Sequence, residues 1–452
     1  MDKKNRFDGW SVDDLIAHIE RLERRKQHGL VWDLERAREK FEEETRTRTP
    51  LLEAVPAQDV GTGSPVHLLV EGDNLHALTV LGQTHAGQVD VIYIDPPYNR
   101  GMSEGYETRY NDRYVDRDEA FRHGKWLSFM YKRLLLARGL LKETGVIFVS
   151  IDDNELAHLK LVMDEIFGEE NYKNTILLRR GSKNVQAQFE TIDRLASGYE
   201  YVLFYTKSPR RFPKMTKALE EARPGSWNNH WRGTDRPTMR YELFGITPKT
   251  GQWRWSRERS LRAAANYELL LTETGKRSSD LSVVEIDAWF LAKCAELGEE
   301  IGLLRLSATG KPEHYVPPTD STLLNDVWFD IAPNSTGVLK AMFGRKVFDN
   351  PKPLELVKRI CQFAPSNALV LDFFAGSGTT LHAVQELNRE DGGQRRVILV
   401  TNDENGICTE VCYPRLRKVI EGHENAKGEK VPGLGGSLKY YRTAFLPSDE
   451  SA

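Results

Sequence analysis

The chain has 452 residues, which exceeds what one hydrophobic core normally holds and indicates two or three domains. Its 63 Lys and Arg residues nearly balance its 66 Asp and Glu residues, so the net charge of −3 excludes a uniformly basic nucleic-acid binder and restricts any such surface to one region. Because no apolar run approaches the roughly 20 residues of a membrane span and no apolar signal core follows the first residues, we expect a cytoplasmic protein without a membrane partner.

Residues 1–60 are predicted to form an N-terminal helical extension. Leu15, Ile19 and Leu22 recur at helical spacing within the stretch "SVDDLIAHIERLERRK", which indicates an amphipathic helix. This pattern is typical of a packing or subunit-contact helix. It suggests no chemistry.

Residues 61–206 are expected to form the first half of an α/β domain. Short apolar strands alternate with helices along this segment, in the order "HLLVE", "VDVIYID", "GVIFVSIDD" and "EYVLFYTK" for the strands, with "KWLSFMYKRLLLARGLL" and "ELAHLKLVMDEIF" among the helices. This alternation predicts a parallel sheet that is covered by helices on both faces.

Residues 207–325 interrupt this pattern and are interpreted as an inserted domain. From Ser208 to Arg262 the chain has 13 Lys or Arg residues against 5 Asp or Glu residues, with four tryptophans among them. Arginine and aromatic side chains suit phosphates and bases, so the insertion is predicted to recognise a nucleic-acid target. The alternative is a small core with a solvated face. The candidate contacts are Arg232, Arg236, Arg240, Arg254 and Arg257.

The α/β pattern returns over residues 326–445, the predicted second half of the domain. The strand "ALVLDFF", the helix "TTLHAVQELN" and the strand "RRVILVTND" follow one another there. The last dozen residues of the chain are expected to be a loose tail. The predicted fold is therefore one Rossmann-like α/β domain that is assembled from two separated halves.

The stretch "VIYIDPPYN" has chemical character, because a buried strand ends on Asp95, Pro96, Pro97 and Tyr98. Asp95 can accept one N–H of an exocyclic amino group, and the Pro96 carbonyl can accept the other. Pro97 keeps the turn rigid, and Tyr98, predicted to be an exposed ring, can stack on a base turned out of a duplex. The amino nitrogen can then attack a methyl group held on a sulfonium.

The stretch "LDFFAGSGTT" is the second with chemical character. Its turn contains Gly376 and Gly378 and opens a helix, which lets a ligand approach the backbone. It lacks the Gly-Lys-Ser/Thr of a phosphate loop, and Leu381 stands where a dinucleotide site needs a small residue. The next strand ends in Asp403 and Glu404, where an acid can bind ribose hydroxyls. A nucleoside cofactor without a pyrophosphate is predicted, with a purely structural turn as the alternative.

These motifs resemble those of the permuted β class of amino-methylating DNA methyltransferases, in which the catalytic motif precedes the cofactor motif. The likeness is to modification (Mod) subunits of type III restriction systems and their solitary relatives. It rests on "DVIYIDPPYN", "YNDRYVDRDEAFRHGKWLSFMYKRL", "GVIFVSIDDNE", "NPKPLELVKRI", "DFFAGSGTT" and "ILVTNDENGICTEVCYPRLRKVI".

The resemblance implies a Rossmann-like, circularly permuted methyltransferase fold with an inserted target-recognition domain. It also implies S-adenosyl-L-methionine as donor, double-stranded DNA as substrate, and adenine N6 as acceptor, because the quartet begins with Asp95. Cytosine-N4 or RNA adenine methylation by the same site is an alternative within enzymes. A DNA-reading specificity subunit of a nuclease complex is an alternative of another class. A homodimer and a separate restriction (helicase-nuclease) subunit are the further partners considered.

The resemblance assigns site residues one by one. Asp95, Pro96, Pro97 and Tyr98 match the catalytic motif. The residues that match cofactor-binding positions are Asp372, Phe374, Gly376, Gly378, Glu404 with Asp403 as its rival, Lys352 in the segment over the methionine part, and Asp73 near the adenine. A helix cap is the alternative for Asp73.

No metal site is predicted. The four cysteines are scattered along the chain, at Cys294, Cys361, Cys408 and Cys412. Cys408 and Cys412 have i,i+4 spacing, but no second pair of cysteines lies near them, as a four-ligand zinc site would need. The histidines, including His123, His230 and His314, have no mutual spacing that suggests zinc and are expected to be surface or hydrogen-bonding residues.

Overall fold

The computed structural model describes residues 10–26, 39–100, 122–181, 195, 197–234, 236–333 and 335–446, and it divides into two compact units. The first unit combines Met1–Phe212 with Asn325–Ala452, and the second is Pro213–Leu324. Residues 101–121 are outside the described residues, and they include the first part, 110–121, of the Mod-like motif that ends in "KWLSFMYKRL".

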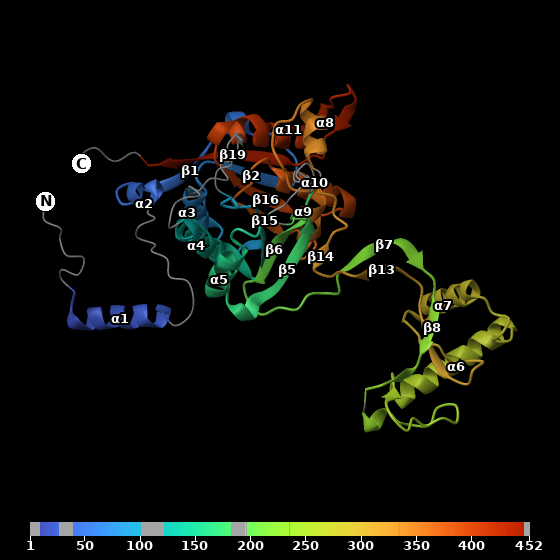
Figure 1. Ribbon diagram of the computed structural model, residues 1–452. Coiled ribbons are helices and arrows are strands. Elements are labelled where there is room, and N and C mark those ends of the chain that lie inside the picture. The colour runs from blue at the N-terminus through green and yellow to red at the C-terminus, as the bar shows by residue number, and fades with distance from the viewer. Residues whose placement is uncertain are drawn as a thin grey trace, which may run out of the picture. The chain divides into compact units, whose positions relative to one another are not determined.

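A ten-stranded sheet forms the centre of the first unit (Figure 1). Its order is β1 (Pro50–Ala54), β19 (Ser437–Phe445), β2 (Val66–Glu71), β16 (Arg396–Thr401), β15 (Leu369–Asp372), β3 (Val89–Ile94), β4 (Leu141–Ile151), β6 (Tyr199–Thr206), β5 (Tyr172–Arg179) and β14 (Val327–Trp328). The strands from β19 to β4 are parallel, whereas β6 runs antiparallel to both β4 and β5.

The strand order reverses between β15 and β3. From β15 the chain steps to β16 on one side, and from β3 it steps to β4 on the other side. Parallel crossovers are right-handed, so the helices that follow β15 and β3 lie on opposite faces of the sheet. The carboxyl ends of β15 and β3 therefore flank the crevice in which open α/β sheets bind ligands.

Two rows of helices cover the sheet (Figure 1). One row contains α3 (Asn74–Thr84), α4 (Arg122–Leu140) and α5 (Leu156–Phe167), and the other contains α9 (Leu354–Cys361), α10 (Thr379–Asp391) and α11 (Tyr413–Glu421). Shorter or separate elements are α1 (Val12–Lys26), α2 (Lys40–Glu44), α8 (Thr336–Phe343) and the β17 (Gly422–Glu424) and β18 (Lys430–Pro432) hairpin. No described helix combines the length and the apolar character that a membrane crossing requires.

Burial explains the central strands. Every residue of β3 and β15 is buried, as expected for parallel strands that are covered on both faces.

Two predictions from the sequence are wrong at the end of the sheet that contains β1 and β19. The N-terminal segment is not only helical, because it contributes β1, and the chain end is not loose as far as Phe445, because β19 pairs with β1 and β2. β1 is short and only partly buried, and β19 mixes polar and apolar residues, so neither strand has a strong apolar signal in the sequence.

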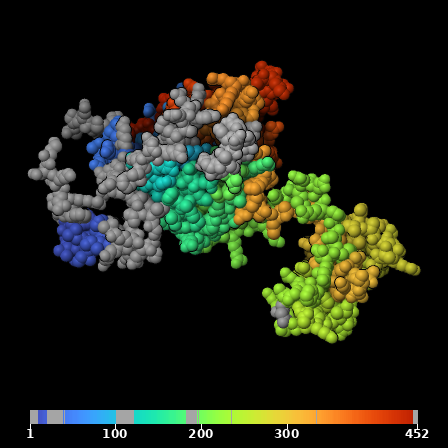
Figure 2. All heavy atoms as spheres, in the orientation of Figure 1, coloured from blue at the N-terminus to red at the C-terminus, as the bar shows by residue number. Residues whose placement is uncertain are grey.

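The second unit has its own small cores. Its strands are β7 (Thr216–Arg223), β8 (Ser226–Asn229), β9 (Trp231–Arg232), β10 (Gln252–Trp253), β11 (Leu304–Leu306), β12 (Pro312–Val316) and β13 (Thr319–Leu323), and its helices are α6 (Arg257–Thr274) and α7 (Val283–Leu297). Trp253 is buried, and Trp227 and Trp255 pack against these cores. The green-to-orange atoms of residues 213–324 form one continuous body (Figure 2).

Candidate active site

The pairing of β3 with β15 brings the two sequence motifs together. Val91 and Ile92 lie opposite Val370 and Leu371 in parallel register, so the catalytic turn after Ile94 and the glycine turn after Asp372 leave the sheet side by side. This is the arrangement expected if one crevice holds both the catalytic carboxylate and the cofactor.

Asp95 belongs to a hydrogen-bonded ionic cluster. The Tyr98 hydroxyl donates to Asp95 Oδ1 over 2.8 Å, and Lys352 Nζ donates to the Tyr98 hydroxyl over 2.6 Å. Lys352 Nζ also lies 2.6 Å from Glu200 Oε1 and 3.4 Å from Asp95 Oδ1. Burial alone would lower the pKa of Lys352, but the carboxylates of Asp95 and Glu200 raise it above its ordinary value. Lys352 therefore stays a cation that fixes the catalytic turn.

Tyr98 is not the exposed ring that the sequence predicts. Only 5% of the residue is accessible, and burial, followed by the charge of Asp95, raises the pKa of its hydroxyl well above the ordinary value. The guanidinium of Arg100 lies over the ring, 4.9 Å from its centre. The ring therefore carries a cation where a stacked base was expected, and its hydroxyl orients Asp95.

Three side chains, one from α4 and two from the turn between β4 and α5, hold the catalytic turn. Trp126 Nε1 of α4 donates to the Pro97 carbonyl over 2.7 Å. Asn99 Nδ2 donates to Glu155 Oε1 over 2.6 Å, and Arg100 Nε donates to Asp152 Oδ2 over 2.7 Å. Sequence reasoning missed Trp126, Glu155 and Glu200, because each lies in an ordinary helix or strand pattern far along the chain from Asp95.

The glycine turn is built around a buried acid. Asp372 accepts hydrogen bonds from the Phe374 amide over 3.0 Å and from the Thr380 hydroxyl over 2.5 Å. Burial raises the pKa of Asp372 to about 7, although both hydrogen bonds act in the opposite direction. No cation within the described residues offsets this carboxylate, which suits a site for a positively charged ligand.

The two glycines of the turn are required for different reasons. Both have positive φ, 49° at Gly376 and 76° at Gly378. A Cβ at Gly378 would lie 2.9 Å from Leu416 Cδ2 and 3.1 Å from Cys412 Sγ, so packing against α11 and the residue before it already explains this glycine. Cofactor contact remains a prediction for both residues and for Phe374, which is buried beside Phe129.

The acidic residues predicted to bind the cofactor differ in the hydrogen bonds that they already make. Asp403 caps the helix after β16, since it accepts from the amides of Cys408 and Thr409 over 3.0 and 2.9 Å. Glu404 is exposed, and none of the described residues donates to its carboxylate. Asp73 accepts a hydrogen bond from the His76 amide over 3.0 Å and so caps α3, which was the alternative to adenine contact. Its side chain is still 48% exposed. Glu404 is thus the better ribose candidate.

The predicted DNA contacts all lie in the second unit. Arg232, Arg236, Arg254 and Arg257 are exposed, whereas Arg240 is partly buried and donates to the Gly251 carbonyl over 2.9 Å. The tryptophans among them mostly serve as core, which was the alternative for this block, and contact with DNA stays a prediction. Arg240 has a structural task that the sequence did not indicate.

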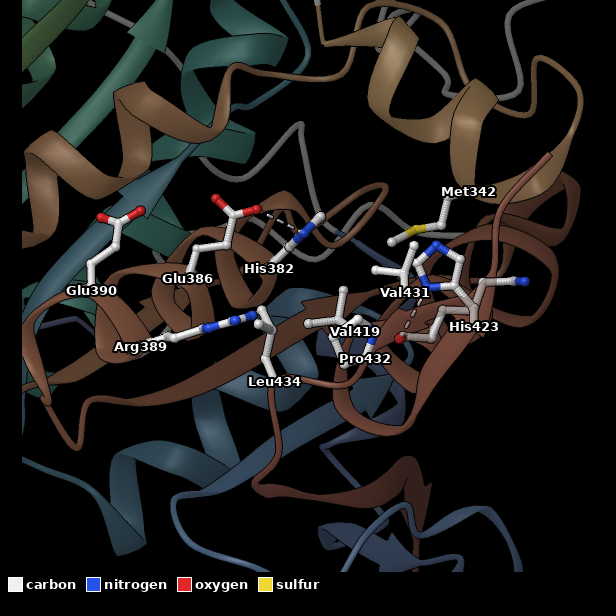
Figure 3. Close-up of a pocket in the computed structure, with 11 residues that line it drawn as sticks. Met342, His382, Glu386, Arg389, Glu390, Val419, His423, Val431, Pro432 and Leu434 are labelled. Atoms are coloured by element: carbon white, nitrogen blue, oxygen red, sulfur yellow. Dashed lines mark hydrogen bonds and ion pairs between the residues drawn. The ribbon is translucent and has the colours of Figure 1, made fainter. Parts of the chain in front are cut away.

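A hollow on the first unit is not the predicted cofactor site (Figure 3). It lies along the middle and far end of α10 and against α11 and β18, between residues such as His382, Glu386, Arg389 and Val431. The cofactor turn opens the other end of α10, at Thr379. None of the predicted site residues is among the described residues that line this hollow.

The hydroxyl of Tyr98 supports a first prediction. Tyr98→Phe should lower the rate of methyl transfer about tenfold or more, since hydrogen bonds to charged groups are worth about 1.5 to 3 kcal/mol. Steady-state kcat and KM on a methylatable DNA measure this. Tyr172→Phe, which removes the hydroxyl that bonds Thr175, is the matched control. An unchanged kcat in Tyr98→Phe would show that the hydroxyl is not needed and that the ring acts only by stacking.

The fold and the site together define a class. The order β2-β16-β15-β3-β4-β6-β5 with β6 reversed, and the two turns meeting at its switch point, are those of a Rossmann-like S-adenosyl-L-methionine-dependent methyltransferase. The model of the DNA methylase family matches residues 89–411. The chain belongs to this DNA methylase family.

Known relatives agree with that membership. The StyLTI Mod subunit, a type III restriction-modification enzyme of Salmonella typhimurium, is 34% identical over 84% of this chain and 60% of its own length. The type II methyltransferase M.KpnI of Klebsiella pneumoniae is 34% identical over 80% of this chain and 86% of its own. The solved M1.HpyAVI–SAM complex is 13% identical, with a TM-score of 0.34 over 78% of this chain and 98% of its own. The chain thus spans about three fifths of the Mod subunit.

Proposed function

We propose that the protein is a site-specific DNA methyltransferase that transfers a methyl group from S-adenosyl-L-methionine to adenine N6 in a restriction-modification or related system. The observation that carries the proposal is the position of Asp95, whose carboxylate ends β3 directly beside the glycine turn that ends β15. The names of the relatives support methylation in restriction-modification.

The chain's own residues account for activation of the acceptor. Asp95 and the Pro96 carbonyl accept the two N–H groups of the amine, which directs the nitrogen lone pair out of the ring. Tyr98 and Lys352 hold Asp95 in place through its Oδ1 atom. The carboxylate keeps 32% side-chain exposure, so a base that is turned out of the duplex can reach it.

The residues also fit the donor. S-adenosyl-L-methionine supplies a methyl group on a sulfonium. Asp372 offers a buried carboxylate without an offsetting cation, Glu404 offers an exposed carboxylate for ribose hydroxyls, and Gly376 leaves the backbone open to a ligand. Lys352 was expected over the methionine part, but its ammonium is engaged with Tyr98 and Glu200, so we assign it to the catalytic turn.

Modified-base sequencing of DNA from cells that express the full chain tests the proposal. We expect N6-methyladenine at one short motif, and none in cells that express Asp95→Ala. N4-methylcytosine would favour the cytosine alternative, and methylation confined to RNA would favour an RNA enzyme. Absence of any modified base, together with sequence-specific DNA binding, would favour a specificity subunit.

The raised pKa of Asp372 gives a pH prediction. A cationic donor favours the ionised carboxylate, so below pH about 7 binding must displace a proton from Asp372, and affinity should rise with pH until about 7. Titration calorimetry in two buffers of different ionisation enthalpy measures the released proton. Asp372→Asn should remove both the proton release and this rise. Equal proton release by the variant would assign the titration to another group.

We infer that the second unit reads the DNA sequence. The four exposed arginines can contact phosphates or guanine edges, and one good bidentate base contact is worth about 1 to 3 kcal/mol of discrimination. A homodimer and a separate restriction subunit stay predictions from the resemblance.

Alanine variants should separate these roles. Each alanine variant of an exposed arginine should have one of two effects. A variant that loses a phosphate contact should bind all DNA more weakly, and the slope of log binding constant against log salt concentration should fall by about 1. A variant that loses a base contact should methylate a motif that is relaxed at one position. The variants are Arg232→Ala, Arg236→Ala, Arg254→Ala and Arg257→Ala. Arg240→Ala should instead lower the stability of the second unit, since it loses the bond to Gly251. An exchange of residues 213–324 with those of a relative that left the motif unchanged in an active chimera would disprove this assignment.

A further inference from the structure

Two histidines and a buried glutamate meet beside the catalytic turn. His123 lies in the first turn of α4, Glu155 immediately precedes α5, and His158 follows one turn later. One ligand atom from each residue lies within 4.8 Å of the other two. Glu155 is fully buried, whereas the side chains of His123 and His158 are 42% and 26% exposed, so the cluster opens to solvent on the histidine side.

The contacts of Glu155 are incomplete. Its Oε1 lies 2.7 Å from His123 Nδ1 and accepts a hydrogen bond from Asn99 Nδ2. Its Oε2 lies 2.9 Å from His158 Nδ1, but the two atoms are not aligned as donor and acceptor, and neither makes a hydrogen bond. A buried carboxylate oxygen and an imidazole nitrogen thus lie at ion-pair distance without a well-aligned hydrogen bond, and a cation that binds both would use their free lone pairs.

We propose that His123, Glu155 and His158 bind a divalent transition-metal ion of the Zn²⁺ class. Imidazole nitrogens with one carboxylate suit Zn²⁺, Co²⁺ or Ni²⁺ better than Mg²⁺ or Ca²⁺, which prefer oxygen ligands. The Glu-x-x-His spacing brings Glu155, at the residue before α5, next to His158 in the first turn of that helix. Three protein ligands and an open, solvent-facing position complete a four-coordinate ion with water.

Metal binding requires only a small adjustment of the site. In a tetrahedral zinc site the ligand atoms stand about 3.3 Å apart, so the two partly exposed histidines must swing slightly outward from Glu155 when the ion binds. Glu155 is held from behind by Asn99, which directly follows Tyr98. The ion would therefore fix a carboxylate that anchors the catalytic turn, in the manner of a positioning group.

Titration of the full-length chain, freed of metal with a chelator and dialysed, tests the site directly. We expect one equivalent of ZnCl₂ to bind by calorimetry, and Co²⁺ to give visible absorption bands of a four- or five-coordinate site. His123→Ala, His158→Ala and Glu155→Gln should each weaken Zn²⁺ binding at least tenfold. Glu155→Gln keeps an oxygen acceptor for Asn99, which protects the fold. His85→Ala, a partly buried histidine at the end of α3, is the control that should bind normally.

Two outcomes would overturn the site. Absence of stoichiometric Zn²⁺ uptake by the folded chain would leave a hydrogen-bonded His–Glu–His cluster only. Uptake that persists unchanged in His123→Ala and His158→Ala would place the ion elsewhere. The result is separate from the proposed methylation, because Asp95→Ala should bind Zn²⁺ like the unmodified chain even though it transfers no methyl group.

Discussion

Asp95→Ala should abolish measurable methyl transfer, a loss of about a thousandfold or more, while the affinity for S-adenosyl-L-methionine stays within a few-fold. The carboxylate acts on the acceptor amine, and groups aimed at the reacting atoms are worth about a hundred- to a thousandfold each. Lys352 keeps its bond to Glu200 in the variant, so the catalytic turn retains its main anchor. Methylation of DNA by radiolabelled donor and calorimetric titration of the donor measure the two quantities.

A second carboxylate provides the control for this experiment. Asp153 follows the neighbouring strand β4, is exposed, and accepts from the Tyr201 hydroxyl over 2.7 Å. Asp153→Ala should leave both methylation and donor affinity nearly unchanged. If Asp95→Ala lost donor affinity to the same extent as activity, its carboxylate would belong to the donor site, and our assignment to the acceptor would fail.

Gly376→Val should abolish measurable binding of S-adenosyl-L-methionine in a chain that still folds. The residue has φ of 49°, a conformation that a β-branched side chain adopts only with strain of about 1 to 3 kcal/mol. The new side chain would also stand in the turn that is expected to face the donor. Calorimetric titration measures the binding, and thermal unfolding reports the strain.

Gly392→Val separates strain from ligand contact. Gly392 ends α10 with φ of 70° and has open space around the position of a Cβ. We expect both variants to unfold at a lower temperature and only Gly376→Val to lose donor binding. Normal titration heat from a folded Gly376→Val chain would show that the turn is merely structural, which was the alternative reading of the sequence.

The sequence predicts the fold best for segments that are stable in only one kind of surroundings, such as the buried interior of a sheet. Strands such as "VDVIYI" are apolar at nearly every position and fit only a sheet that is covered on both faces, and the structure has them there. The two acidic strand ends, Asp95 and Asp372, lie on neighbouring strands, because β3 pairs with β15. A strand such as β19, which mixes buried and exposed residues, resembles a tail when it is considered without its partners β1 and β2.

The site was less predictable, because most of its contacts join residues that are far apart in the chain. Nothing near Lys352 indicates that its ammonium lies between Glu200 and Asp95. Tyr98 belongs to the main apolar core, and Arg100 and Lys352 lie over its ring, whereas an aromatic residue after two prolines suggests exposure. His123 and His158 belong to different helices, so their approach to Glu155 follows from helix packing alone.

The interleaved strand order has a consequence for synthesis of the chain. β2 lies between β16 and β19, and β3 lies against β15, so these early strands await partners that the ribosome adds about 280 to 370 residues later. Until Leu369 has emerged, the newly made first half can form a sheet in the order β3-β4-β6-β5. The side of β3 that later pairs with β15 is then an apolar edge without a neighbouring strand. Such an edge is prone to aggregation, which makes the nascent first half a natural client for chaperones.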